Sequence, residues 1–227
     1  MPDDLTAGGY LPASFLGWDG HVAAVIFTSG CNFRCPFCHN SDLVLAKTEP
    51  SLLDAVIDDI RRRSKFLDGV VVSGGEPCLW PGLMPLLREL KSLGLPVKLD
   101  TNGSFPDALK AAIDEGLVEY IAMDIKAPLD EETYRRVTRS KVPLENITRS
   151  MKLRRESGLG YEFRTTYVPE LLSEGELLKI CSDIAEDGRW FVQCFKPNNC
   201  LDAAFLEYKA VEPETLEKLL PGIIVRG

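Results

Sequence analysis

Three cysteines lie within eight positions of the sequence, in the segment "TSGCNFRCPFCHN". They are Cys31, Cys35 and Cys38, and thiolates suit zinc and iron–sulfur clusters alike. A closed site of either kind normally takes four protein ligands. The sequence has no second C-x-x-C pair, and His39 directly follows Cys38, so it is poorly placed to reach the same ion. The spacing favours an iron–sulfur cubane with one open position, and structural zinc with His39 as fourth ligand stays the alternative.

Further chemistry-bearing residues follow the apolar segments of the chain. Six of these segments have the length and composition of buried strands; they span residues 21–30, 69–75, 96–103, 119–128, 161–169 and 189–197. After the cysteine loop, the residues at or near their ends that could contact a ligand are Gly74, Gly75, Glu76, Asp100, Thr101, Asn102, Asp124, Lys126, Arg164 and Gln193. Because the carboxyl ends of parallel strands meet at one edge of a sheet, these residues predict one shared site.

Helical patterns separate these strands. The first spans 51–63, where Ser51 and Asp54 stand at capping-box spacing; the others span 83–94, 105–116, 131–138, 144–157, 173–186 and 213–222. Alternating strands and helices predict a mostly parallel sheet with right-handed crossovers. Six units are too few for a closed eight-stranded barrel, so we predict an α/β fold, a partial (βα)6 TIM-like barrel. It would form a single domain over residues 1–227, with an N-terminal extension at about 1–20 and a C-terminal tail at about 198–227.

Composition narrows the class of protein. The 227 residues carry a net charge of −8 and a sequence pI of about 4.9, which argues against non-specific nucleic-acid binding. No apolar run approaches the roughly 18 residues of a membrane-spanning helix, and the start of the chain lacks the pattern of a signal peptide. Seven cysteines in such a chain predict reduced thiols and a cytoplasmic location.

The cysteine loop resembles the signature of the radical S-adenosylmethionine (SAM) enzymes, C-x-x-x-C-x-x-C with an aromatic residue before the last cysteine, here Phe37. The resemblance implies that the three cysteines hold a [4Fe–4S] cluster whose fourth iron is chelated by the amino and carboxylate groups of SAM. The open position is then the seat of the cosubstrate. "SGGEP" (73–77) resembles the family's glycine-rich strand end, which contacts the methionine amino group.

The segments "GCNFRCPFCHN", "LDTNG" and "MDIKAP" together resemble the activating enzymes of glycyl radical proteins, and most of all those of anaerobic ribonucleoside-triphosphate reductase. By this resemblance Lys126 pairs with the cosubstrate carboxylate, with Arg164 as a second candidate, and Phe37 lies near the adenine. Asp100, Thr101 and Asp124 would surround the cosubstrate and a monovalent cation. The resemblance assigns the remaining strand-end residues to the cosubstrate as well: Ser73, Gly74, Gly75, Glu76 and Asn102.

The implied activity is reductive cleavage of SAM to methionine and a 5′-deoxyadenosyl radical, which takes a hydrogen atom from a glycine of a partner protein. A flavodoxin or ferredoxin would supply the electron, and no catalytic residue is expected beyond the cluster and the cosubstrate. Two alternatives within the fold stay open: activation of a pyruvate formate-lyase-type partner, and small-molecule chemistry such as that of 7-carboxy-7-deazaguanine synthase. A non-enzymatic metal-binding module would not account for the polar strand ends.

Four further cysteines stand outside the motif. Cys78, Cys194 and Cys200 follow strand ends and would share the rim of the cluster, so an auxiliary metal or redox site is one interpretation. No C-x-x-C pair exists among them, which favours three unrelated thiols. Cys181 falls on the apolar side of a helix and is predicted to lie in the core.

Overall fold

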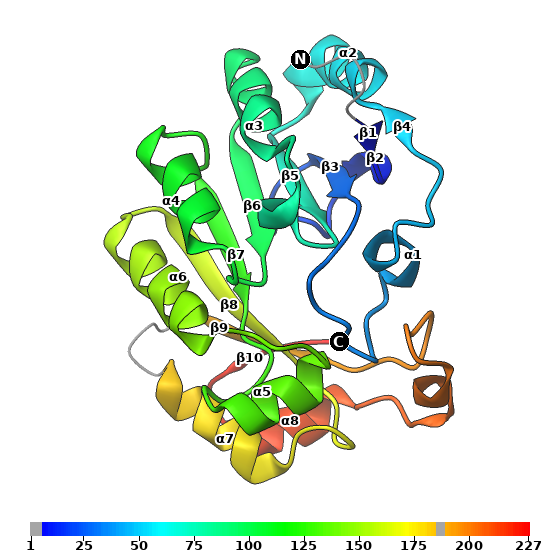
Figure 1. The fold of residues 1–227 in the computed structure, drawn as a ribbon, viewed down its shortest axis with the longest axis vertical. Helices are drawn as coiled ribbons and strands as arrows, with labels where there is room; N and C mark the ends of the chain where they lie inside the picture. The colour runs from blue at the N-terminus through cyan, green and yellow to red at the C-terminus, as the bar shows by residue number, and fades with distance from the viewer. Residues whose placement is uncertain (1–5, 185–188) are drawn as a thin grey trace.

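The computed structural model describes residues 6–184 and 189–227. Its centre is a curved sheet of eight strands in the order β10-β9-β8-β7-β6-β5-β3-β2 (Figure 1). These strands are β2 (Gly9–Ser14), β3 (Ala23–Thr28), β5 (Gly69–Gly74), β6 (Val97–Thr101), β7 (Tyr120–Asp124), β8 (Gly160–Tyr167), β9 (Trp190–Cys194) and β10 (Ile224–Arg226). A separate two-stranded sheet pairs β1 (Thr6–Ala7) with β4 (Ser51–Leu52).

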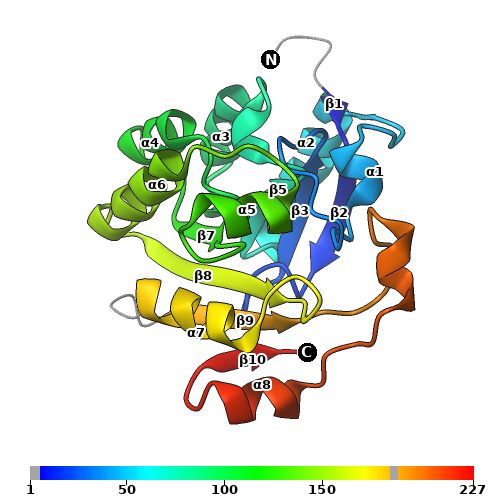
Figure 2. The ribbon, with the colours of Figure 1, turned by 60° about the horizontal axis from the view of Figure 1, so that its bottom comes forward.

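The main sheet is open, because its edge strands β2 and β10 do not pair with each other in the described ranges. β2 runs antiparallel to β3, and all other neighbours are parallel. In Figure 2 the helices α7 and α8 lie along β9 and β10. The helices are α1 (Ser41–Val44), α2 (Leu53–Arg63), α3 (Leu83–Ser92), α4 (Pro106–Asp114), α5 (Glu131–Thr138), α6 (Leu144–Glu156), α7 (Glu174–Asp183) and α8 (Pro213–Leu219).

The two faces of the sheet bury different side chains, since successive residues of a strand point to opposite faces. The face that packs on the helices forms the larger apolar core, which includes Ile26, Val72 and Leu99. The inner face of the curve carries a smaller apolar cluster of Trp18, Ala23, Val25 and Val71. Towards the carboxyl ends this inner face becomes polar, and that change creates the site described below.

The six strands predicted from sequence are all present, and the partial barrel is confirmed. The two edge strands were not predicted: β2 contains Pro12 and exposed Leu11, and β10 has only three residues. They lie in the predicted N-terminal extension and C-terminal tail. The end of the helix predicted at 173–186 lies outside the described residues, as do the first five residues, which belong to the region predicted to lack a signal peptide.

The capping box predicted at Ser51 is wrong. Ser51 and Leu52 pair with β1, so the helix begins at Leu53 with no side-chain cap. The residues that the local pattern assigns to the start of the helix form a short strand instead. None of the helices in the described ranges combines the length and apolar character that a membrane crossing requires.

Candidate functional site

A cavity of about 270 Å³ lies at the carboxyl ends of the parallel strands. The three predicted cluster cysteines and all the predicted cosubstrate residues line it. They are Cys31, Cys35, Phe37, Cys38, Ser73, Gly74, Gly75, Glu76, Asp100, Thr101, Asn102, Asp124, Lys126 and Arg164. Parallel strand ends have therefore gathered residues that are up to 133 positions apart in the chain.

The cysteine loop leaves β3 through Gly30, whose φ of 86° is a left-handed conformation that glycine adopts without strain. Cys35 is buried, whereas Cys31 and Cys38 are partly exposed. Within the described ranges, no three His, Cys, Asp or Glu side chains are arranged to hold one metal ion. The ring of His39 lies against the Lys196 carbonyl, with Nε2 at 2.8 Å. His39 lines the same cavity as the three cysteines, and a cubane would bind each thiolate to a different iron.

The thiols of this loop are hard to ionise without a metal. Burial raises the pKa of Cys31 to about 11 and that of Cys35 to about 12, and the positive charge of Lys126 opposes the rise in both cases. Coordination to a metal deprotonates a thiol outright. Lys126 therefore lies where it can stabilise the negative charge that coordination creates.

Residues 196–202, here called the covering segment, lie directly against the cysteine loop. The backbone N–H of Asp202 donates to the Pro36 carbonyl at 2.9 Å, and Asn199 Nδ2 donates to the His39 carbonyl at 2.6 Å. An ion pair of 2.7 Å between Arg139 and Asp202 anchors the segment to the end of α5. The predicted C-terminal tail thus supplies one wall of the loop.

The end of β5 packs backbone to backbone against the start of the cysteine loop. Gly75 N donates to the Thr28 carbonyl at 3.0 Å, and Glu76 N donates to the Gly30 carbonyl at 2.8 Å. An added Cβ would lie 2.3 Å from Thr28 N at Gly74, and 2.0 Å from Gly30 O at Gly75. Only glycine fits at either position.

We expect Gly75→Ala to weaken SAM binding by at least about tenfold, an effect of about 1.4 kcal/mol, because the new Cβ pushes the strand end away from the cysteine loop. Equilibrium dialysis of SAM against the cluster-loaded protein, under anaerobic conditions, would measure this. Gly175→Ala is the matched control, since a Cβ there meets nothing within 4 Å. Unchanged affinity in Gly75→Ala would contradict the close packing as a requirement for the site.

Glu76 joins the ends of two neighbouring strands. Its carboxylate is almost fully buried and accepts hydrogen bonds from Thr101 Oγ1 and Asn102 N, both at 2.7 Å, and from Cys78 N at 3.0 Å. Burial raises the pKa of Glu76, and these hydrogen bonds oppose the rise. The structure thus gives Glu76 an internal role; its contact with the cosubstrate stays a prediction.

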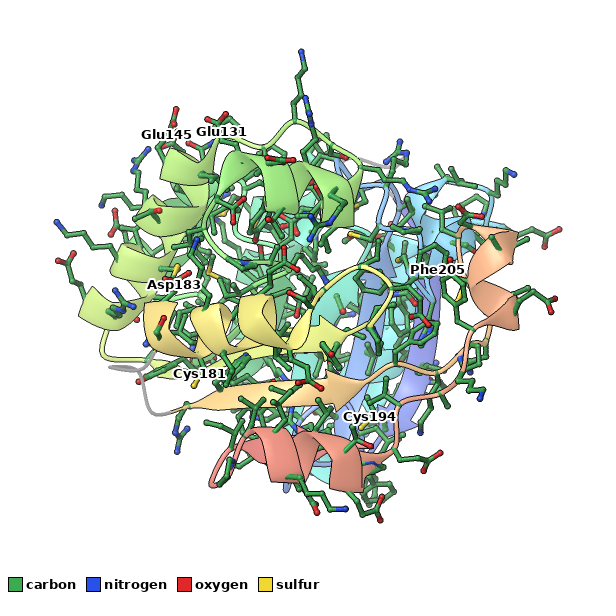
Figure 3. The ribbon with its side chains drawn as sticks, turned by 90° about the horizontal axis from the view of Figure 1, so that it is seen from below. Glu131, Glu145, Cys181, Asp183, Cys194 and Phe205 are labelled. Carbon is green, nitrogen blue, oxygen red and sulfur yellow. The ribbon has the colours of Figure 1, made fainter. Side chains whose placement is uncertain are left out.

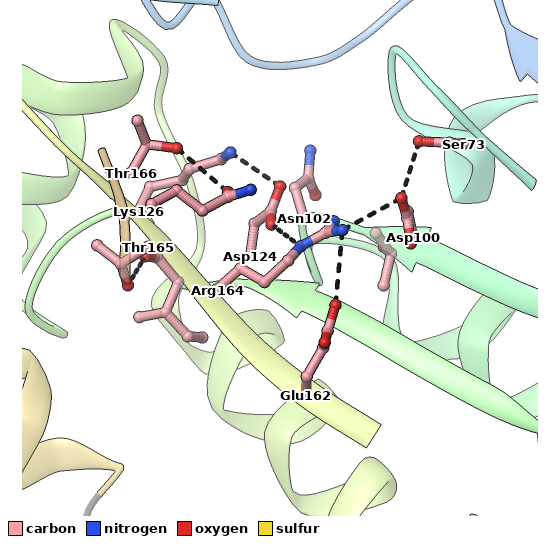
Figure 4. A network of polar contacts seen from close by, with 12 residues as sticks. Ser73, Asp100, Asn102, Asp124, Lys126, Glu162, Arg164, Thr165 and Thr166 are labelled. Carbon is pink, nitrogen blue, oxygen red and sulfur yellow. Dashed lines mark hydrogen bonds and ion pairs between the residues drawn. The ribbon is translucent and has the colours of Figure 1, made fainter. Parts of the chain in front are cut away.

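Charged side chains alternate in sign across the inner face (Figure 4). Asp124 accepts from Arg164 Nε at 2.8 Å and from Lys126 Nζ at 2.9 Å. Arg164 Nη1 also lies 3.3 Å from Asp100 Oδ2, which accepts from Ser73 Oγ at 3.0 Å. Burial acts to raise the pKa of Asp124, but the charges of Arg164 and Lys126 outweigh it and hold the pKa at about 2. This carboxylate is therefore ionised at neutral pH.

One oxygen of this network has no hydrogen bond. Asp100 Oδ1 is buried and has no hydrogen-bond partner among the described residues; Lys98 Nζ lies 3.8 Å away. Buried acceptors in proteins are nearly always satisfied. Because Asp100 lines the cavity, a bound cation or a donor group of a ligand fits this oxygen.

Below the cavity the network continues through residues that sequence analysis missed. Lys98 Nζ donates to the Gly17 carbonyl at 2.8 Å and lies 3.3 Å from Glu162. Arg226 of β10 pairs with Glu162 at 2.9 Å and with Asp19 at 2.6 Å. Two of these residues could have been found from the sequence, because Lys98 and Glu162 are charged residues inside predicted buried strands, in "PVKLD" and "YEFRT".

Several other residues of the cavity wall had no cosubstrate role in the prediction. Asn40, which follows the cysteine motif, donates through Nδ2 to the Gly74 carbonyl at 3.3 Å. The others are Phe33, His39, Val44, Pro77, Thr166 and Gln193. Asn40 could have been found as the polar residue next to the motif, whereas Val44 and Phe33 carry no chemical signal in the sequence.

The three additional rim cysteines have different surroundings. Cys78 is buried, and its pKa is raised well above the usual value by burial and by the charge of Glu76. Cys194, labelled in Figure 3, is buried at the end of β9; burial and the negative charges of Glu214 and Glu217 on α8 raise its pKa. Cys200 belongs to the covering segment. Whether the three act together or as unrelated thiols stays a prediction. Cys181 packs against the core from α7, as predicted.

Fold and site together define a class: a partial parallel barrel in which a three-cysteine loop and the strand ends share one cavity. The sequence pattern of the Radical SAM superfamily matches residues 25–181. The chain belongs to the radical SAM superfamily, whose members use a [4Fe–4S] cluster and SAM.

Two named relatives illustrate the likeness in sequence. A protein of Methanocaldococcus jannaschii, named as a candidate glycyl-radical enzyme activating enzyme, is 29% identical over 216 residues, which are 93% of this chain and 88% of that protein. The pyruvate formate-lyase-activating enzyme of Staphylococcus aureus strain USA300 is 39% identical over 95 residues, 38% of each chain.

Solved structures share the fold at low sequence identity. Streptococcus suis SuiB bound to its precursor peptide SuiA matches with a TM-score of 0.67 and 15% identity over 89% of this chain. A tagged anSMEcpe with bound AdoMet matches with a TM-score of 0.60 and 20% identity over 85% of this chain. This chain spans about half of those chains, 48% and 56% respectively, so the likeness concerns the barrel alone.

The residues present fit the cofactors of the family. Three thiols of one loop supply the soft ligands that an iron–sulfur cluster takes. Beside them, Gly74 and Gly75 let the end of β5 pack against the cysteine loop, and Lys126, Asp100 and Asp124 offer both signs of charge at the cavity wall.

Proposed function

We propose that this protein is a radical SAM activase that generates a glycyl radical in a partner protein. The observation that carries the proposal is the relative in Methanocaldococcus jannaschii, because its likeness spans 93% of this chain. That likeness extends well beyond the residues that the superfamily pattern covers. An activase is therefore favoured over other radical SAM chemistries, including 7-carboxy-7-deazaguanine synthesis.

When bound, the cluster and SAM supply a one-electron reductive cleavage of a carbon–sulfur bond, giving methionine and a 5′-deoxyadenosyl radical. One hydrogen atom from a partner glycine completes 5′-deoxyadenosine, so one electron and one SAM leave one glycyl radical. The protein contributes binding, orientation and exclusion of water. Cys31, Cys35 and Cys38 would hold the cluster.

The cavity offers matched groups for the cosubstrate. Lys126 would turn from Asp124 to the carboxylate of SAM, while the strand end at Gly74 and Gly75, which lines the cavity, would lie beside its methionine part. The unpartnered Asp100 Oδ1 suits the amino group or a monovalent cation. Phe37, buried beside the cysteines, would face the adenine.

The open sheet supports a protein substrate. Among the described residues its edge strands β2 and β10 are not paired with each other, so the sheet does not close into a full barrel. A partner loop that carries the glycine would enter the cavity at the carboxyl ends of the strands. Anaerobic ribonucleoside-triphosphate reductase is the first candidate partner, from the resemblance of the motifs. A formate-lyase-type partner is the second, favoured by the 39% identity to the Staphylococcus aureus enzyme.

An electron donor such as flavodoxin or ferredoxin would reduce the cluster. The seven cysteines are all free, which suits the reducing cytoplasm where such donors work. The proposed function does not include binding to nucleic acid or to a membrane.

The test is an anaerobic assay of the cluster-loaded, reduced protein with SAM. We expect 5′-deoxyadenosine and methionine, and, with the candidate partner added, an electron paramagnetic resonance signal of a glycyl radical. Partner protein labelled with deuterium at glycine should transfer one deuterium to 5′-deoxyadenosine. If SAM is cleaved but neither candidate partner shows a glycyl radical or transfers deuterium, the protein is still a radical SAM enzyme, but these two proteins are not its partners. No cleavage at all would overturn the proposal.

Lys126→Ala is expected to keep the cluster but weaken SAM binding by about ten- to a hundredfold, because a hydrogen bond to a charged group contributes about 1.5–3 kcal/mol. Asp124 would still be neutralised by Arg164, so the site should remain folded. Iron content and visible absorption report the cluster, and equilibrium dialysis reports SAM.

Lys179→Ala is the matched control, because Lys179 is exposed and pairs with Asp130 only at 3.7 Å. It should bind SAM like the unmodified protein. Normal SAM affinity in Lys126→Ala would show that this lysine does not bind SAM.

A further inference from the structure

Asn102 aims its side-chain amide at a cysteine of the motif loop. It stands at the exit of β6, only 5% exposed, and its Nδ2 lies 3.9 Å from Cys31 Sγ. That distance suits a weak N–H···S hydrogen bond, which is longer than a bond to oxygen. Once Cys31 is a metal-bound thiolate, its sulfur becomes a stronger acceptor.

Neighbouring side chains determine which way the amide points. Asn102 Oδ1 accepts from Ser104 N at 3.0 Å and also from Ser104 Oγ. Asn102 Nδ2 donates to Asn32 Oδ1 at 2.9 Å, and Asn32 Nδ2 donates to Ser104 Oγ at 2.8 Å. The three side chains form a closed ring. One hydrogen of the Asn102 amide goes to Asn32, and the second is left for the sulfur.

The backbone around Asn102 is also fixed by hydrogen bonds. Its N–H donates to Glu76 at 2.7 Å, and the carbonyl of the following Gly103 accepts from Ser150 Oγ at 2.7 Å. Asn146 Nδ2 donates to the Ser104 carbonyl at 3.1 Å. The segment that follows β5 and the helix α6 thus both support the turn. This is more than an Asn-Gly turn requires, since the turn alone needs no side-chain bond to a cysteine.

We propose that Asn102 is a positioning residue that donates an N–H···S hydrogen bond to Cys31 and thereby raises the reduction potential of the cluster. A donor at a ligand sulfur stabilises the more negative, reduced state, and such bonds are among the features that set cluster potentials. The inference rests on the proposed function in that the cysteines hold a cluster. It gives Asn102 a role towards the cluster in place of the predicted role towards the cosubstrate.

The test is the midpoint potential of the cluster in the intact protein, from an anaerobic redox titration followed by electron paramagnetic resonance, without SAM or partner. Asn102→Ala removes the donor and adds no charge. We expect its potential to fall, with the reduction equilibrium shifted by about tenfold, which is about 59 mV for one electron. Asn146→Ala is the matched control, because it removes a neighbouring hydrogen bond but leaves the bond to Cys31 in place; its potential should be unchanged.

Asn102→Asp is the second variant, because it keeps the shape and the acceptor that Ser104 uses but cannot donate. Its potential should fall at least as far as that of Asn102→Ala, since it also adds negative charge. An unchanged potential in either cluster-loaded variant would overturn this inference alone. Loss of the cluster from both variants would also overturn it, because Asn102 would then be required for cluster assembly instead of setting the potential. A wild-type protein without a reducible cluster would overturn the proposed function as well.

Discussion

Replacing Cys35 with alanine is expected to abolish both cluster assembly and SAM cleavage. Cys35 is the buried member of the three cysteines, and a cubane left with two thiolates in an open cavity has too few ligands to persist. Iron and sulfide analysis after anaerobic reconstitution should find almost no cluster, and 5′-deoxyadenosine should be undetectable. Cys31→Ala and Cys38→Ala should behave in the same way.

Cys181→Ala is the matched control, because this cysteine lies on α7 and packs against the core. It should assemble a cluster normally and should lose only a little stability. A Cys35→Ala protein that still cleaved SAM would show that the central assignment is wrong. A Cys181→Ala protein without a cluster would instead point to a general loss of folding.

Arg164→Ala is expected to destabilise the protein by about 3–5 kcal/mol, the usual cost of removing one partner from a buried ion pair. Arg164 is the cation between Asp124, at 2.8 Å, and Asp100, at 3.3 Å. Without it, both carboxylates lose this ion-pair partner in a largely buried site. The pKa of Asp124, now held at about 2, should rise as well. Anaerobic urea unfolding followed by circular dichroism would measure the free energy of unfolding.

Two further variants separate charge from other causes. Arg164→Met keeps most of the side-chain volume, so a loss similar to that of Arg164→Ala assigns the effect to charge. Arg149→Ala removes an exposed pair of 2.6 Å with Asp107 and should cost about 0–1 kcal/mol. An Arg164→Ala protein as stable as the Arg149→Ala protein would contradict the view that the inner network depends on this cation.

Much of the fold could be predicted because parallel strands buried on both faces are nearly continuous apolar runs. "AAVIFT" and "GVVVSG" have that character, and the helices between them carry clear apolar faces. The edge strands escaped prediction for the opposite reason. β2 is paired on one side only and contains a proline, and β10 exists because the sheet offers it a neighbour.

The site could be predicted because its residues occupy strand ends, and topology alone brings such ends together. What sequence could not predict is the partner that each buried polar group takes. Glu76 bonds to Thr101 and to the backbone of Asn102 rather than standing free, and Asn102 turns to Asn32 and Cys31. These choices depend on distances across strands, which spacing along one strand does not encode.

The covering segment has a consequence for the order in which the protein is made. The cysteine loop is translated early, but Asn199 and Asp202, which bond to it, are added near the end. At about 5–20 residues per second, the ribosome needs on the order of 10–30 s to pass from Cys31 to Lys196. During that interval the nascent thiols lack the wall that the finished chain gives them. The cysteine loop therefore reaches its final surroundings only when the covering segment has been added to the chain.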